Sequence, residues 1–231
     1  MSVRSVWQAA FVASLAVLAF GIWFQVSMKQ HWTGAPLPYG LRNPCLAMQM
    51  AKEPWPAEML DPGQNRAEIA RQQHIDYGYI PSYVALFLFV AILQSNSSKR
   101  WVAALGPISI VLTLVGATYD LSENRAILAV TELGDASAWM AIRPNSLGKW
   151  GCVFLVILLQ SLFYFTVPMR GVFARVLARI VGAAALAAGS IGLWNSITGN
   201  EMGIGMATLP LLVTVIAMPV FLLLGWRNAL P

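Results

Sequence analysis

Six long apolar runs recur along the chain, separated by segments that carry nearly all of its charged residues. Each run is close to the roughly 20 apolar residues that an α-helix needs to cross a bilayer. The predicted spans are residues 6–26, 75–95, 101–119, 150–167, 172–194 and 206–226. The pattern therefore predicts an all-α fold. It is a polytopic membrane bundle of six transmembrane helices that forms a single domain over residues 1–231.

The longest connection, residues 28–74, predicts an outer cap of short amphipathic helices. Asn43 and Pro44 form a helix start, and Pro54 is a stop signal. Asn65 is a candidate cap for a further helix, "RAEIARQQHIDYGYI", that runs directly into the second span. We expect these helices to pack on the mouth of the bundle, with a mobile lid as the alternative.

The second long connection, residues 120–149, contains helical stretches that we expect to break at Gly134 and at Pro144. The connections on the other side, "NSSKR" and "PMRGVFAR", are too short to hold a folded unit. Long connections on a bundle tend to carry function. The functional side is therefore expected to be the one with the long connections.

Composition supports the membrane assignment and excludes a separate soluble domain. Hydrophobic residues make up 58% of the chain and charged residues only 11%, against roughly 25% charged in soluble domains. The net charge of +5 is explained by membrane topology, so no nucleic-acid partner is expected.

The basic residues also predict an orientation. With the N-terminus inside, the inner segments carry seven Lys or Arg and no Asp or Glu: Arg4, Lys99, Arg100, Arg170, Arg175, Arg179 and Arg227. Excess positive charge marks the cytoplasmic side. We therefore predict a multi-pass protein of the bacterial inner membrane, with both termini cytoplasmic and with membrane lipids as partners.

A polar cluster is predicted at the outer edge of the apolar layer. One crossing takes about 20 residues. Counting that length from Arg100 reaches Asp120, and counting back from Ser95 reaches Ile75, beside Asp76. The fourth span begins directly after Lys149. Three ionisable residues from three helices thus lie at one level.

Helical spacing adds neighbours to this level. Tyr79 and Tyr83 follow Asp76 on one helix face, and Glu123 and Asn124 share a face with Asp120. The candidate ligand-binding residues are Asp76, Tyr79, Tyr83, Asp120, Glu123, Asn124 and Lys149.

Two interpretations of the cluster stay open. In the functional one, a buried carboxylate acts as proton carrier or general acid/base, and Lys149 and Arg125 bind an anionic group. In the structural one, the same residues form an interhelical network that fixes helix register near water.

Other chemistries have little support in the sequence. His74, Asp76 and Glu123 are candidate metal ligands, but the chain has only two histidines and no HExxH or CxxC spacing. No metal and no cofactor is therefore predicted. Cys45 and Cys152 lie on the same side, so a disulfide is permitted but not required.

Two stretches carry a resemblance: "HIDYGYIPSYVALFLF" in the second span and "YDLSENRAIL" after the third. They resemble an uncharacterised family of small polytopic bacterial integral membrane proteins with a D-x-x-E-N motif after the third span. The resemblance covers about residues 45–128. It implies a shared fold and highlights Asp76, Asp120, Glu123 and Asn124, and it supplies no activity.

The leading functional hypothesis is an outward-facing polar pocket that binds an amphipathic or lipid-like small molecule. One alternative is a membrane-embedded enzyme acting on a lipid headgroup, with Glu123 or Asp76 as acid/base and Lys149 as electrophile. Another is a structural subunit that docks a membrane protein partner.

Overall fold

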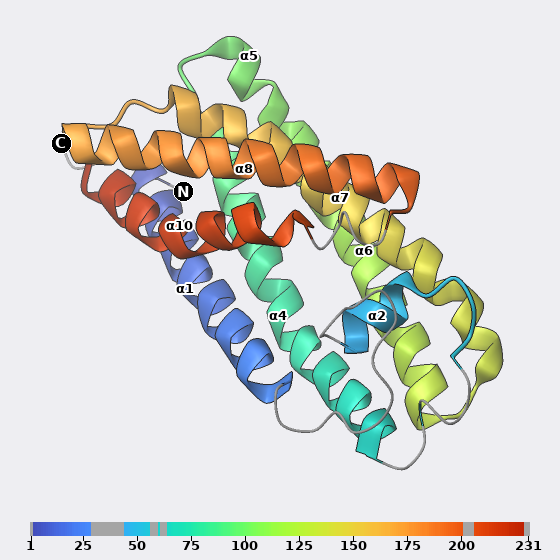
Figure 1. The fold of residues 1–231 in the computed structure, drawn as a ribbon. Helices are drawn as coiled ribbons and strands as arrows, with labels where there is room; N and C mark the ends of the chain where they lie inside the picture. The colour runs from blue at the N-terminus through green and yellow to red at the C-terminus, as the bar shows by residue number, and fades with distance from the viewer. Residues whose placement is uncertain (1, 29–43, 56–59, 61–63, 201–205, 229–231) are drawn as a thin grey trace.

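The computed structural model describes residues 2–28, 44–55, 60, 64–200 and 206–228, and these are helical with no strand. The long helices are α1 (Val3–Met28), α4 (Gln64–Ser95), α6 (Leu105–Glu132), α7 (Trp139–Thr166), α8 (Val172–Thr198) and α10 (Thr208–Asn228) (Figure 1). The short ones are α2 (Pro44–Met50), α5 (Arg100–Ala103) and the 3₁₀ turn η2 (Ala136–Ala138). The all-α helix bundle is confirmed, and six helices are long and apolar enough to cross a membrane.

The six long helices form a ring in chain order. Each packs against its neighbours in the sequence, and α10 packs against both α8 and α1, which closes the ring. Aromatic side chains fill the interior. The Trp7 ring of α1 lies 6.2 Å from Phe163 of α7 and 5.7 Å from Phe221 of α10. These contacts join helices that are far apart in sequence.

Two glycines illustrate how small residues allow close helix approaches. A Cβ on Gly189 of α8 would lie 2.8 Å from the backbone nitrogen of Leu158 in α7. A Cβ on Gly225 of α10 would overlap the Trp7 ring. Small residues at such points let helix backbones and large side chains meet closely in a membrane bundle.

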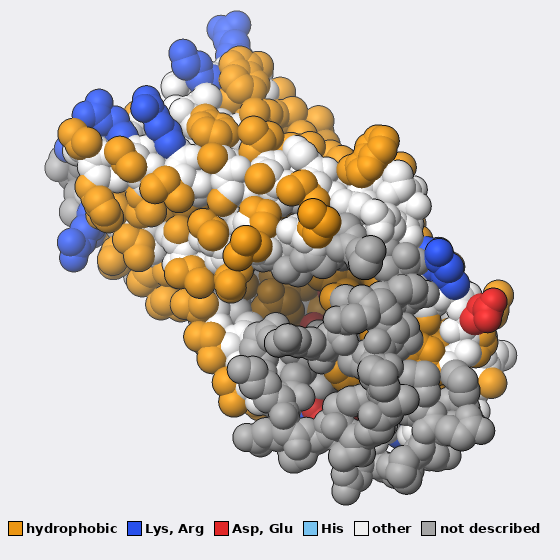
Figure 2. Space-filling model, in the orientation of Figure 1, with side chains coloured by type: hydrophobic (Ala, Val, Ile, Leu, Met, Phe, Trp, Pro, Cys, Tyr) orange, Lys and Arg blue, Asp and Glu red, His pale blue; other side chains and the backbone are white. Residues whose placement is uncertain are grey.

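The bundle has two chemically different ends. Lys and Arg side chains gather around the end where α5 lies, where α1 begins and where α10 ends (Figures 1 and 2). We call this the basic end. At the opposite end α2 packs on α4 and α7, and we call this the capped end.

The helices that meet the cap are longer than the predicted spans. At 1.5 Å per residue the 32 residues of α4 extend about 48 Å, compared with about 30 Å of hydrocarbon in a bilayer. The expected continuous helix from the outer connection into the second span is confirmed, although Asn65 lies inside α4 instead of capping it. The helix α6 likewise continues through "DLSENRAILAV" to Glu132.

The two expected breaks in the second connection had different outcomes. The break at Gly134 is confirmed, and this glycine has a φ of 68°, in the left-handed region. The break at Pro144 is wrong, because Pro144 lies inside α7. Pro144 lies near the start of α7 and has no N–H to donate to the carbonyl of Met140. Met140 is exposed, so the helix continues despite this missing hydrogen bond.

A second apolar cluster lies under α2, apart from the main core. The α2 side chains of Cys45 and Met48 are buried in it with Ile69 of α4, Ile127 of α6 and Ile142 of α7. The predicted helix start at Pro44 is confirmed, while Asn43 lies outside the described residues. The described part of the cap is thus packed on the bundle.

Candidate functional site

A layer of polar side chains separates the two apolar clusters. On α4, α6 and α7, the apolar residues that pack under α2 lie nearest the capped end. Polar residues lie next to them, on the side of the basic end. The layer contains seven residues, which we call the polar cluster: Gln49, Asp76, Tyr83, Asp120, Glu123, Asn124 and Lys149.

Lys149 is the centre of the cluster. Its Nζ atom lies 2.7 Å from Oε1 of Glu123 and 3.0 Å from Oδ1 of Asp120. The side chain of Glu123 is completely buried, and those of Asp120 and Lys149 are nearly so. One cation from α7 therefore serves two carboxylates that lie one turn apart on α6.

Two further hydrogen bonds join α4 to α6. The Tyr83 hydroxyl donates to Oδ2 of Asp120 at 2.6 Å, and Nδ2 of Asn124 donates to Oδ2 of Asp76 at 2.8 Å. The ring of Tyr79 lies 5.6 Å from that of Tyr83. The structure thus brings together the seven residues that the sequence selected: six belong to the polar cluster, and Tyr79 lies beside it. Their role in binding a ligand remains a prediction.

Sequence reasoning missed one member of the cluster. Gln49 of α2 donates from Nε2 to Oε1 of Glu123 at 2.6 Å and is buried. It is a polar residue in a short helix whose other buried side chains are mostly apolar. A buried polar residue among apolar ones is a signal of a polar partner. That partner, Glu123, is 74 residues away and cannot be predicted from local spacing.

Two residues considered for the site lie elsewhere. Arg125 is exposed, because it follows Asn124 on α6 and points away from the buried face. His74 pairs with Glu132, with 2.8 Å between Nε2 and Oε1, in place of joining Asp76. Lys149 already binds two carboxylates. The geometry therefore does not support an anion site built from Lys149 and Arg125, nor a metal site at His74.

The cluster leaves buried acceptor atoms without a hydrogen-bond partner. These are Oδ1 of Asn124, Oε2 of Glu123 and Oδ1 of Asp120, of which the last lies in the ion pair with Lys149. The Ser146 hydroxyl lies within hydrogen-bonding reach of the Glu123 carboxylate but donates within its own helix, to the carbonyl of Ile142 at 2.9 Å. By contrast, the buried Gln94 near the basic end donates to the carbonyl of Leu159 and accepts from Ser109. Buried polar atoms without partners are rare in folded proteins and call for a physical explanation.

Comparison of the chain with protein-family models, with curated proteins and with solved structures gave no match. The functional conclusion therefore depends on the geometry of the chain itself. Across the described residues no three His, Cys, Asp or Glu side chains come close enough to hold a metal ion.

The two cysteines are not joined. Both are free thiols, and the Cys45 thiol donates to Oε1 of Gln72 at 2.8 Å. Burial raises the pKa of the Cys45 thiol well above its usual value. Cys152 lies on α7 against Gly116 of α6. The optional disulfide is thus absent, and Cys45 acts as a buried packing residue.

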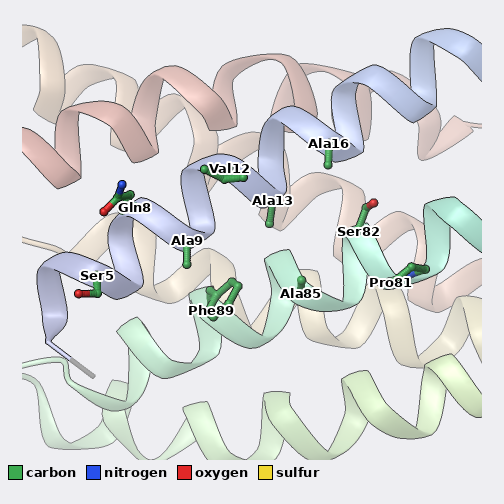
Figure 3. A pocket seen from close by; sticks show the side chains of 10 residues that line it. All are labelled: Ser5, Gln8, Ala9, Val12, Ala13, Ala16, Pro81, Ser82, Ala85 and Phe89. Carbon is green, nitrogen blue, oxygen red and sulfur yellow. The ribbon is translucent and has the colours of Figure 1, made fainter.

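Two surface hollows lie away from the cluster. One, of about 580 Å³, runs between α1 and α4 and has no charged side chain in its lining (Figure 3). Its lining residues are Ser5, Gln8, Ala9, Val12, Ala13, Ala16, Pro81, Ser82, Ala85 and Phe89. The other, of about 590 Å³, lies between α4 and α6 near the capped end and is lined in part by Arg66, Arg71 and His74.

Proposed function

We propose that this protein is a multi-pass protein of the bacterial inner membrane that binds an amphipathic molecule. In this proposal the headgroup of the ligand lies at the polar cluster and its apolar tail lies beside the aromatic side chains of α4. The observation that carries the proposal is the pair of buried acceptors, Asn124 Oδ1 and Glu123 Oε2, which lack a partner within the described chain.

The depth of the cluster supports a headgroup site. Asp120 lies 20 residues beyond Arg100, which corresponds to about 30 Å of helix from the basic end and so to one bilayer crossing. At that depth the lipid headgroups begin. An amphipathic molecule in the membrane would therefore present its polar group at the level of the cluster.

Aromatic side chains continue from the cluster toward the basic end. The Tyr83 ring lies 5.8 Å from that of Phe87, one turn further along α4, and Tyr79 and Phe87 are both partly exposed. In Figure 2 the visible face is hollowed beside α10, and acidic side chains are seen at the floor of the hollow. These features favour a site with a polar top and an aromatic wall, as amphipathic ligands require.

The alternative with specific support is a purely structural network. The bonds of Lys149, Tyr83 and Gln49 tie α2, α4, α6 and α7 together. Such a network would fix helix register without any ligand. The two functions differ in what happens when a partly exposed member of the cluster is changed.

Asp76 is that member, since its side chain is partly exposed and Asn124 is its hydrogen-bond partner. We would purify wild type, Asp76→Asn and Glu53→Gln in a mild detergent and record native mass spectra. Glu53 is an exposed carboxylate that follows α2 at the capped end, and it serves as the matched control.

We expect an amphiphile bound to wild type and to Glu53→Gln, and its loss from Asp76→Asn. Equal adducts in all three proteins, or none in wild type, would overturn the proposal and favour the structural network. For the orientation, a cytoplasm-specific reporter fused to the C-terminus should be active. An inactive fusion beside an active periplasmic one would contradict it.

A further inference from the structure

The charges of the polar cluster do not balance. The cluster holds three carboxylates, those of Asp76, Asp120 and Glu123, and one ammonium group, that of Lys149, which contacts Asp120 and Glu123 but not Asp76. The other basic residue on this stretch, Arg125, is exposed and turned away. Excess charge of one sign in a buried site is unfavourable unless a partner of opposite charge is present. With all three carboxylates ionised, the cluster therefore carries an excess of negative charge.

The free hydrogen-bonding atoms point to the same kind of partner. Asn124 is completely buried, and its amide is directed into the cluster because Nδ2 binds Asp76. Its carbonyl oxygen, Oδ1, has no partner, and neither does Oε2 of Glu123. An amide oxygen accepts hydrogen bonds, and so does the oxygen of an ionised carboxylate. The missing partner is therefore a donor, and a fully ionised phosphate monoester supplies none.

The accessible part of the cluster adds aromatic faces. Asp76 is the carboxylate that is not fully buried, and Tyr79, one turn along α4, is also partly exposed. Aromatic rings attract cations through their faces. A cation already occupies such a position nearby, because Nζ of Lys149 lies 5.1 Å from the centre of the Trp150 ring.

We propose that the cluster selects an amphiphile with a cationic, nitrogen-centred headgroup, which binds at Asp76 between the aromatic rings of α4 and the free acceptors of α6. This inference rests on the proposed function. It narrows the ligand to one charge class and excludes phosphate-terminated amphiphiles, whose charge the carboxylates repel.

The experiment compares three probes with the same alkyl chain: dodecylammonium, the neutral monododecyl glycerol and dodecyl phosphate. Each is added to the full-length protein in a neutral polyoxyethylene detergent, and binding is measured by native mass spectrometry. The proteins are wild type, Asp76→Asn, Asn124→Ala and Glu53→Gln. Asn124→Ala removes the free carbonyl without changing any charge, so it tests the site even if Asp76→Asn does not fold.

We expect dodecylammonium to bind wild type one to one and at least about tenfold more tightly than the other two probes. The preference should disappear in Asp76→Asn, weaken in Asn124→Ala and persist in Glu53→Gln. Dodecylammonium binding that is equal in all four proteins would overturn the inference as non-specific attraction.

The outcomes also separate this inference from the proposed function. If the neutral or the phosphate probe binds as tightly as the amine, and Asp76→Asn or Asn124→Ala weakens that binding, the charge class is wrong and the amphiphile site remains. If no probe binds wild type in preference to these two variants, both proposals fail.

Discussion

The ammonium group of Lys149 lies 2.7 Å from Oε1 of Glu123 and 3.0 Å from Oδ1 of Asp120, so one residue of α7 holds two carboxylates of α6. Since all three side chains are buried, each depends on the others for its charge to be tolerated. The pairing explains how three buried charged side chains are accommodated beside the apolar parts of the helices.

Replacing Lys149 by methionine should be strongly destabilising. Lys149→Met leaves Asp120 and Glu123 buried without a cation, which should lower the free energy of unfolding by about 3–5 kcal/mol. Thermal and denaturant unfolding in detergent measure the change. Arg125→Met is the matched control, because Arg125 is exposed on the same stretch. Equal stability of Lys149→Met and wild type would contradict the ion pairs.

Tyr83→Phe removes one hydroxyl and keeps the ring. The lost hydrogen bond to Oδ2 of Asp120 should cost about 1.5–3 kcal/mol, because its acceptor is a charged group. Tyr77→Phe is the control, since Tyr77 lies on the same helix and only its ring contact with His74 is seen. A loss of stability of the same size in both variants would show that the hydroxyl of Tyr83 is not special.

Gln49→Leu should loosen the cap while the bundle stays folded. The substitution removes the bond from α2 to Glu123, and we expect faster amide exchange in residues 44–51 by mass spectrometry. Glu53→Gln, just beyond α2, should leave that exchange unchanged. Unchanged exchange in Gln49→Leu would mean that apolar packing alone holds α2.

Cys45 should be unreactive in the folded protein. Its thiol is buried and its pKa is raised, so little thiolate is available to attack a maleimide. The Cys152→Ser variant leaves Cys45 as the single thiol and should be labelled only after unfolding. A cysteine-free background carrying Glu53→Cys should be labelled at once. Prompt labelling of Cys45 would show that α2 does not cover it.

Gly189→Ala tests the contact between α7 and α8. The added methyl group would lie 2.8 Å from the backbone of Leu158, and we expect a loss of about 1–3 kcal/mol in stability. Gly151→Ala is the control, because nothing lies within 4 Å of a Cβ at that position. It should be neutral or gain up to about 1 kcal/mol from helix propensity. A neutral Gly189→Ala would mean that the helices move apart easily.

Counting residues along the helices was enough to predict that the charged residues of the polar cluster lie at one level. Asp120 and Asp76 lie one bilayer crossing from the basic end on adjacent antiparallel helices, so a shared level follows from rise per residue alone. Helical periodicity places Tyr83 on the face of Asp76 and Asn124 on the face of Asp120. The structure adds the hydrogen bonds between the two faces. Regular geometry makes such distances predictable over the length of one helix.

The contacts that the sequence did not predict involve residues outside the predicted spans. Gln49, which binds Glu123, lies on the short cap helix α2, and the position of α2 over the bundle cannot be derived from periodicity. His74 binds Glu132 because α6 continues well past the apolar run. That continuation is polar on one side, and its apolar residues, such as Ile127, are buried only because α2 covers them. The predicted spans end where the apolar runs end, so they stop short of these helix ends, which the sequence indicates only as helical stretches in the outer connections.

The sequence by itself determined the six apolar helices, the segregation of charge to the two ends and the level of the polar cluster. Each of these depends on composition, helical rise and periodicity, which are local properties. Only the tertiary structure decided that Lys149 binds two carboxylates, that α2 reaches Glu123 through Gln49, and that Asn124 keeps a free acceptor. Those relationships depend on which side chains meet across the bundle, and packing selects them among many pairings that the same local pattern allows.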